Sequence, residues 1–260
     1  MTFSIVARDP ATGDFGIAIA SKALAVGSIA PYARAGVGAI STQAMPNVAY
    51  GPDGLARLAA GEDAESALAA LVTADSLRAN RQAGIVDAAG RAATFTGASC
   101  MDWAGGRVAP GVAVQGNILV GPEVVDQMLA TWLAATRTFP RRLLAALRAG
   151  GAAGGDSRGR LSAALLVVRA KGGIGGLDDR WIDLRVDDHT DPTAELDRLL
   201  DIFEQQTNLL DPATLARVGS ALASTLKSAI TSAVAPKTTG ASLDGMLTAS
   251  DAEARSDEAG

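Results

Sequence analysis

Thr2 is the residue of this sequence best suited to nucleophilic chemistry. Removal of the initiator methionine is usual when the second residue is small, and it would leave Thr2 with a free α-amine. Such an amine titrates at about pH 8 and lies within reach of the hydroxyl of its own residue. One residue would then supply both nucleophile and base. The alternative interpretation is that Thr2 only opens a β-strand, which threonine favours.

Ser21 and Lys22 are the residues that a β-hairpin would bring to Thr2. The run from Thr2 to Lys22 reads as an apolar strand, the turn-forming stretch DPATGD and a second apolar strand. Counting outward from the turn places Thr2 opposite Ser21, whereas a shift of one residue places it opposite Lys22. In the second register the lysine cation would lower the pKa of the amine and stabilise developing negative charge. The alternative for Lys22 is a solvated side chain at a strand end.

Two amide side chains stand in otherwise apolar strands. Asn117 interrupts the strand VAVQGNILVG (112–121), and Gln43 lies at the end of the strand GVGAISTQA (36–44). A buried amide must find hydrogen-bond partners. Each of the two therefore either holds an oxyanion or a substrate, or bridges to a neighbouring backbone.

The loop GGAAGGDSRGR (150–160) carries Asp156 and Arg158. A carboxylate and a guanidinium there either bind a polar substrate or hold the loop in place. The loop lacks the Gly-Lys-Ser/Thr ending of a phosphate-binding loop. Cys100 and His189 are single in the sequence, which argues against a zinc-type site, so we expect neither a metal nor a cofactor.

Composition limits the kinds of partner. The 260 residues include 28 acidic and 23 basic side chains, and the arginines are scattered along the chain, so nucleic acid is not expected as a partner. No apolar stretch reaches the roughly 18 to 20 residues that span a bilayer, and no charged n-region precedes an apolar h-region. The sequence therefore predicts a cytoplasmic protein without membrane contact.

The elements that must hold these residues follow the order strands, helices, strands, helices, strands and helix. Strands joined by tight turns are antiparallel, which excludes a doubly wound parallel sheet. Two antiparallel sheets packed together with helices outside explain the many strongly apolar strands. The predicted class is α+β, a four-layer α-β-β-α sandwich. The expected strands lie in 2–22, 36–44, 81–97, 112–121, 162–168 and 181–186, and the expected helices lie in 46–75 and after Pro122, Pro140 and Pro192, the last capped by Asp191.

The predicted main domain covers residues 2–208. Small residues and leucines in 209–234 favour a helical extension, and 235–260 contains almost no large apolar side chain, which is typical of a disordered tail. The extension would be able to pack against a partner or a second copy, and the Ala- and Leu-rich helices permit a homodimer.

Several stretches together resemble one known family. They are TFSIVARDPATGDFGIAIASKALAVGSIAPYARAGVGAISTQA, YGPDGL, GIVDAAGRAATFTG, QGNILVGPEVVD, GGDSRGRLSAALLVV and GLDDRWIDLRVDDHTDP, and they closely resemble the domain-of-unknown-function family DUF1028 over about residues 2–203. That family is placed in the N-terminal-nucleophile (Ntn) hydrolase superfamily, beside the proteasome β-subunits. The resemblance implies an α-β-β-α sandwich and a Thr2 nucleophile exposed by loss of Met1. By position it also implies an oxyanion-hole amide in STQA (41–44), which includes Thr42.

The sequence thus predicts an Ntn-type amidohydrolase acting on an amide or lactam-like bond of a small molecule. Thr2 would attack, its α-amine would carry the proton, Lys22 would tune that amine, and amides near Gln43 or Asn117 would stabilise the oxyanion. The alternative is a catalytically inactive descendant of the fold that serves as a binding or assembly module.

Overall fold

The computed structural model describes residues 2–155, 158–209, 220 and 224–225. The chain divides into two units, residues 1–204 and 205–260. Of the second unit, the described residues are 205–209, which end a helix, and three further helical residues at 220, 224 and 225. The predicted extension (209–234) and tail (235–260) therefore lie almost wholly outside the described residues.

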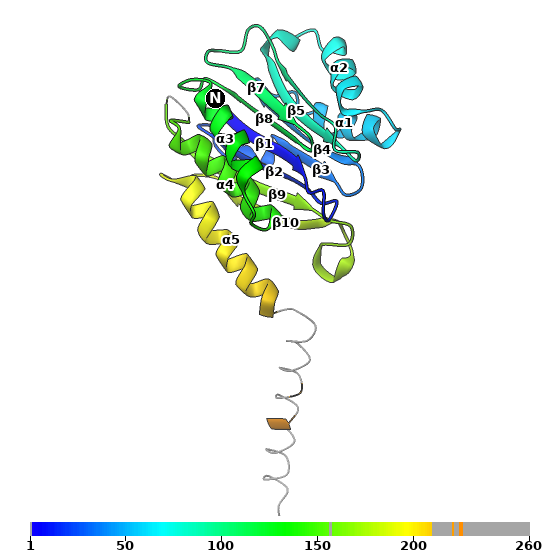
Figure 1. Ribbon diagram of the computed structural model, residues 1–260, viewed down its shortest axis with the longest axis vertical. Coiled ribbons are helices and arrows are strands. Elements are labelled where there is room, and N and C mark those ends of the chain that lie inside the picture. The colour runs from blue at the N-terminus through cyan, green and yellow to red at the C-terminus, as the bar shows by residue number, and fades with distance from the viewer. Residues whose placement is uncertain (1, 156–157, 210–219, 221–223, 226–260) are drawn as a thin grey trace, which may run out of the picture. The chain divides into compact units, whose positions relative to one another are not determined.

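Two antiparallel sheets form the centre of the first unit, as Figure 1 shows. One sheet has six strands in the order β10-β9-β2-β1-β8-β7, and the other has four in the order β3-β4-β5-β6. The strands of the larger sheet are β1 (Thr2–Arg8), β2 (Phe15–Ser21), β7 (Gly105–Ala109), β8 (Val112–Asn117), β9 (Ser162–Val168) and β10 (Arg180–Val186). Those of the smaller sheet are β3 (Pro31–Arg34), β4 (Gly38–Ala44), β5 (Arg81–Asp87) and β6 (Ala92–Thr96).

Each sheet buries one face against helices. Phe3 and Ile5 of β1 belong to a core cluster with Leu143 and Leu147 of α4, and this cluster also takes in side chains of α3 and α5. Ile40 of β4 belongs to a second cluster with residues of α1 and α2. The helices are α1 (Tyr50–Ala59), α2 (Ala64–Ala74), α3 (Glu123–Ala134), α4 (Phe139–Ala152) and α5 (Pro192–Leu209).

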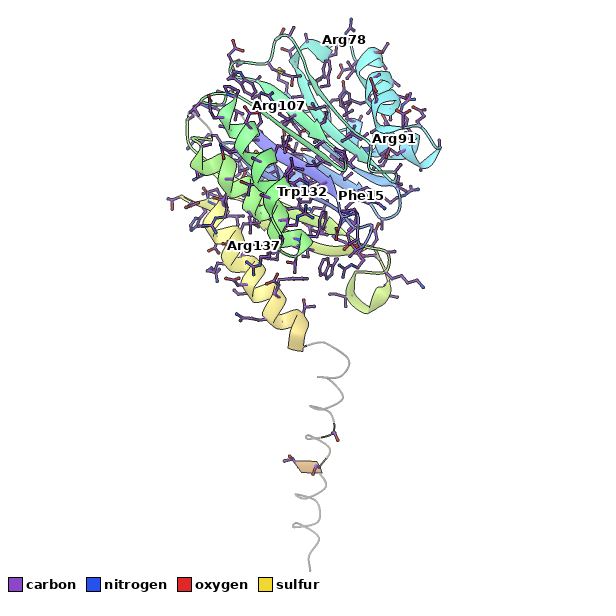
Figure 2. The ribbon with its side chains drawn as sticks, in the orientation of Figure 1. Phe15, Arg78, Arg91, Arg107, Trp132 and Arg137 are labelled. Atoms are coloured by element: carbon purple, nitrogen blue, oxygen red, sulfur yellow. The ribbon has the colours of Figure 1, made fainter. Side chains whose placement is uncertain are left out.

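Aromatic contacts fix the junction of α3 and α4. The rings of Trp132 and Phe139 meet edge to face, with centroids 5.8 Å apart and planes at 78°. The Arg142 guanidinium lies 4.0 Å from the centroid of the Trp132 ring, whose position Figure 2 marks. Such cation–π and edge-to-face contacts add to the burial of apolar area and orient one helix on the other.

The opposite faces of the two sheets pack against each other, and their contact differs from one end to the other. At one end the contact is apolar and includes Val6, Phe15 and Ile17 of the larger sheet with Ala39 and Val86 of the smaller one. Side chains alternate along a strand, so the same faces continue to the other end. There they carry buried polar residues, which we call the inter-sheet polar layer: Thr2, Ser4, Ser21, Ser41, Gln43, Gln82, Gln115, Asn117 and Ser162.

The structure confirms the coarse prediction of a mixed α+β fold with two antiparallel sheets. Both predicted hairpins form, and two short helices occupy the 46–75 stretch. Asp191 caps the last helix, because its carboxylate accepts hydrogen bonds from the Ala194 N–H (3.2 Å) and the Thr193 hydroxyl (3.0 Å). Two strands, β3 and β7, were not among the predicted elements. No helix within the described part of the chain is both long and apolar enough to span a bilayer.

Candidate active site at the start of β1

Thr2 is the first residue of β1, in the interior of the six-stranded sheet. It pairs with Ser21 of β2 on one side and with Asn117 of β8 on the other. The Thr2 hydroxyl lies 3.0 Å from the Ser21 hydroxyl, and Thr2 as a whole is only 6% exposed. The Ser21 oxygen also accepts a hydrogen bond from the Ala23 N–H at 3.0 Å. This bond holds the Ser21 oxygen in place, and with it the partner of the Thr2 hydroxyl.

The register decides between the two hairpin alternatives. Thr2 is opposite Ser21, and Lys22 lies one residue beyond the end of β2 with an exposed side chain. The register that would have placed Lys22 across from Thr2 is therefore wrong. Because neighbouring residues of a strand point to opposite faces, only one of the two could share a face with Thr2.

Two amide side chains hold the backbone carbonyl of Thr2. The Gln43 Nε2 group donates to this oxygen at 3.2 Å and the Asn117 Nδ2 group at 3.5 Å. Each amide also donates to one common acceptor, the Gln82 Oε1 atom, at 2.8 Å and 2.9 Å. An amide nitrogen carries two hydrogens, so both amides have protein acceptors for all of them. Their contacts are thus to the residue that carries the hydroxyl, not to an open site.

The rest of the polar layer extends this network along β1. The Ser4 hydroxyl donates to Gln43 Oε1 at 2.6 Å and accepts from Gln115 Nε2 at the same distance. Gln115 Oε1 and the Ser41 hydroxyl are buried without a hydrogen-bond partner among the described residues. Buried polar networks of this kind act as units, because each member orients the next.

Thr42, Arg158 and Asp156 are the remaining predicted site residues. Thr42 follows Ser41 in β4, so its side chain lies on the opposite face of the strand from Gln43. The Thr42 hydroxyl is buried there without a hydrogen-bond partner among the described residues, and a role for Thr42 in the site stays a prediction. Arg158 lies in the loop before β9, and Asp156 lies outside the described residues.

The hydrogen-bond partners of Thr2 among the described residues carry no charge. They are the side chains of Ser21, Gln43 and Asn117. The single histidine, His189, is exposed, and its Nδ1 atom accepts a hydrogen bond from the Asp191 N–H at 3.0 Å. It therefore does not form a triad with Thr2 or Ser21. Within the described ranges, no three His, Cys, Asp or Glu side chains gather as metal ligands.

Sequence reasoning missed Gln82 and Gln115. Both are fully buried, and both lie at the same end of the sheets as Thr2. A signal was present in the pattern, because polar residues repeat at alternate positions in three strands: Thr2 and Ser4, Ser41 and Gln43, Gln115 and Asn117. Polar residues at positions i and i+2 share one face of a strand.

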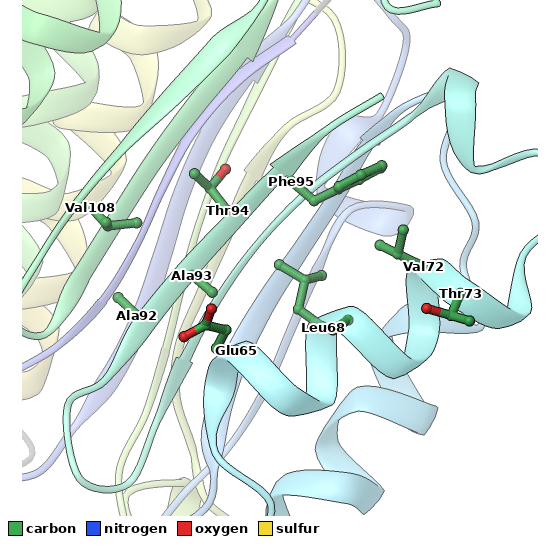
Figure 3. Close-up of a pocket in the computed structure, with 10 residues that line it drawn as sticks. Glu65, Leu68, Val72, Thr73, Ala92, Ala93, Thr94, Phe95 and Val108 are labelled. Carbon is green, nitrogen blue, oxygen red and sulfur yellow. The ribbon is translucent and has the colours of Figure 1, made fainter. Parts of the chain in front are cut away.

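A groove of about 520 Å³ lies elsewhere, along α2 and the edge strand β6, as shown in Figure 3. Its walls are mainly apolar, with Leu68, Val72 and Phe95 among the larger side chains, and Glu65 brings the one charged group among the lining residues. None of these residues belongs to the inter-sheet polar layer. The groove is therefore separate from the Thr2 site.

Comparison with known proteins places the chain in a family. The family of unknown function DUF1028 matches residues 2–196, and the chain belongs to it. Protein SPO2555 from Silicibacter pomeroyi, itself matched to DUF1028, has a crystal structure that is similar to this one. The two share 36% sequence identity with a TM-score of 0.71, over 77% of this chain and 88% of that one. None of the curated proteins matches this sequence.

Proposed function

We propose that this protein is an Ntn-type amidohydrolase that cleaves an amide or lactam-like bond of a small molecule through Thr2. The observation that carries the proposal is the placement of Thr2. It is the first residue of a central strand, with its hydroxyl 3.0 Å from a second hydroxyl and its carbonyl within reach of two amides. The proposal includes the finer interpretation of the fold as a four-layer α-β-β-α sandwich of the Ntn type, which the two helix-covered sheets support.

The α-amine of Thr2 is the base in this proposal. The side chains of Ser21, Gln43 and Asn117, which hydrogen-bond to Thr2, are all uncharged, so in this mechanism the residue supplies its own proton acceptor once Met1 is removed. A free α-amine with a pKa of about 8 is partly unprotonated at neutral pH. It is held within the same residue as the hydroxyl, which gives it the proximity that a general base needs.

The reaction then proceeds in two halves. The Thr2 Oγ1 atom attacks the amide carbon while the α-amine takes the hydroxyl proton, and the proton passes to the leaving amine as the C–N bond breaks. Water next attacks the acyl-threonine ester, the α-amine again takes a proton, and the acid product leaves with Thr2 regenerated. Ser21 orients the Thr2 hydroxyl. Gln43 and Asn117 hold the Thr2 carbonyl, so we assign to them the support of the nucleophile in place of the oxyanion role.

Lys22 has no part in this mechanism, because the observed register leaves its side chain exposed beyond the end of β2.

Removal of Met1 is the first step to test, because both the nucleophile and the base of the mechanism belong to Thr2. Intact-mass analysis of the natively purified protein should show a chain that starts at Thr2. Full retention of Met1 in protein that still turns over substrate would refute the mechanism.

Covalent labelling tests the nucleophile itself. An electrophilic acyl probe, such as a β-lactone, should form an ester with wild-type protein that peptide mapping locates at Thr2. Thr2→Ala should abolish labelling, and Thr2→Ser should keep it, since serine retains a hydroxyl next to the α-amine. Ser4→Ala is the matched control, because Ser4 is a buried hydroxyl of the same strand and face. Labelling that survives in Thr2→Ala would show that another residue reacts. A wild-type protein inert to a broad set of amides, lactams and acyl probes would favour the binding-module alternative.

A further inference from the structure

Gln82 is the most connected side chain of the inter-sheet polar layer. It is the second residue of β5, fully buried, with Gln43 of β4 and Thr96 of β6 as its cross-strand neighbours. Its Oε1 atom accepts from Gln43 (2.8 Å) and Asn117 (2.9 Å). Its Nε2 atom donates to the Gly116 carbonyl (2.7 Å), the Thr96 hydroxyl (2.9 Å) and the Gly105 carbonyl (3.3 Å).

These contacts give the Gln82 amide one orientation. Its nitrogen faces acceptors only, in the shape of two carbonyls and a hydroxyl, so its oxygen must point to Gln43 and Asn117. Each of those two amides then donates one hydrogen to Gln82 and directs the other to the Thr2 carbonyl. The Gln115 carbonyl, 3.4 Å from Gln43 Nε2, is a longer second acceptor for the Gln43 amide. Gln82 thereby directs both hydrogen bonds to Thr2 without touching Thr2 itself.

The need for such support follows from the place of Thr2 at the chain end. Once Met1 is removed, Thr2 loses a peptide bond on its N-terminal side, and terminal residues fray unless they are tied down. Its carbonyl is the atom through which the network holds it. A nucleophile displaced by about 1 Å loses up to about a hundredfold in rate, because attack requires a narrow geometry.

We propose that Gln82 is a positioning residue for Thr2, which it acts on through Gln43 and Asn117. The inference rests on the proposed function, since it concerns the same nucleophile. Gln82 fixes the carbonyl of the terminal residue, and the fixed carbonyl keeps the hydroxyl and α-amine in place for attack. The role belongs to a residue of the smaller sheet, so the docking of the two sheets is part of the active-site geometry.

The test is the rate at which a β-lactone labels Thr2. The maximal rate constant of labelling and the half-saturating concentration of the β-lactone are measured separately. Gln82→Met keeps the length of the side chain and removes every hydrogen bond. We expect its maximal labelling rate to fall by about tenfold to a hundredfold, with the half-saturating concentration unchanged. Gln82→Glu keeps an acceptor for Gln43 and Asn117 and should recover part of that rate.

Ser41→Ala is the matched control. Ser41 is equally buried in the same layer and also belongs to the smaller sheet, but its hydroxyl has no hydrogen-bond partner among the described residues. Its labelling rate should stay within about threefold of wild type, a change of well under 1 kcal/mol in barrier. Gln82→Asn provides a milder variant in case Gln82→Met does not fold, since its shorter side chain withdraws the common acceptor from Gln43 and Asn117, and it should lower the rate in the same direction. Urea unfolding and intact mass confirm that each variant is folded and has lost Met1.

The outcomes separate the two proposals. A folded Gln82→Met or Gln82→Asn variant that labels at the wild-type rate would overturn the positioning role, and so would an equal loss in Ser41→Ala. In either case the labelling of Thr2 in wild type would still stand. If wild-type protein is not labelled at Thr2, the proposed function fails and the positioning role fails with it.

Discussion

We expect Asp75, which follows α2, to make the free energy of unfolding fall as the pH is lowered into the acid range. Its carboxylate accepts hydrogen bonds from Asn47 Nδ2 (2.9 Å), Arg81 Nε (2.9 Å) and the Leu77 N–H (2.8 Å), and its side chain is 8% exposed. Burial alone would raise the pKa of Asp75, but these hydrogen bonds and the Arg81 charge outweigh it and lower the pKa to about 2. The carboxylate therefore joins the loop after β4 to the start of β5.

The size of the effect follows from the two pKa values. The ordinary value is 3.8 and the folded value is about 2, and each pH unit of difference is worth about 1.4 kcal/mol, so the charged carboxylate stabilises the fold by about 2.5 kcal/mol. A folded pKa below the unfolded one means that this stability is present above pH 3.8 and is lost as the pH falls toward 2. At pH 3 about half of it should remain.

Urea unfolding at pH 6 and pH 3 measures this contribution. Asp75→Asn keeps the shape of the side chain and cannot ionise, so wild type should exceed it in stability by about 2.5 kcal/mol at pH 6 and by about half as much at pH 3. Asp53→Asn is the control, because Asp53 is an exposed carboxylate of the nearby helix α1. A difference between wild type and Asp75→Asn that is the same at both pH values would refute the reasoning.

Two further predictions concern packing. Leu143→Ala should lower the free energy of unfolding by about 3 kcal/mol, because Leu143 is fully buried in the core between α4 and the larger sheet, and truncation leaves a cavity there. A loss below about 1 kcal/mol in urea unfolding would contradict this prediction, because it would show that neighbouring side chains move in and fill the cavity. Gly84→Ala should cost about 1–3 kcal/mol, because its Cβ would overlap the buried Gln115 amide. Shortening that neighbour in Gly84→Ala/Gln115→Ala should recover part of the loss, and an unchanged midpoint in the single variant would contradict the close approach.

Local sequence signals predicted the hairpins and helices well. The turn between β5 and β6 forms where Asp87 begins the stretch DAAG, and the Asp87 carboxylate accepts from the Ala89 and Arg91 N–H groups at 2.9 Å. Such turn chemistry lies within a few residues and is therefore visible in the sequence. The missed strands, β3 and β7, are short edges of their sheets. An edge strand has one partner only, and so its sequence is less constrained toward apolar residues.

The site was predictable only in part, for a physical reason. Alternation along β1, β4 and β8 fixes which residues share a face, but it does not say which faces meet. Gln82 lies 39 residues from Gln43, its neighbour within the smaller sheet, and 35 from Asn117, and its contact with Asn117 depends on the docking of the two sheets. Thr42 illustrates the same limit, since it is next to Gln43 in sequence and lies on the opposite face of β4.

The inter-sheet polar layer also bears on the order in which the protein folds and unfolds. Gln43 and Gln82 belong to one sheet while Thr2 and Asn117 belong to the other, so the hydrogen bonds from Gln43 to Thr2 and from Asn117 to Gln82 form only when the sheets have docked. Contacts absent from the folding transition state change the unfolding rate and leave the folding rate nearly unchanged. We predict that the sheets dock after the transition state, so that breaking this layer shortens the lifetime of the native state with little effect on how fast the chain reaches it.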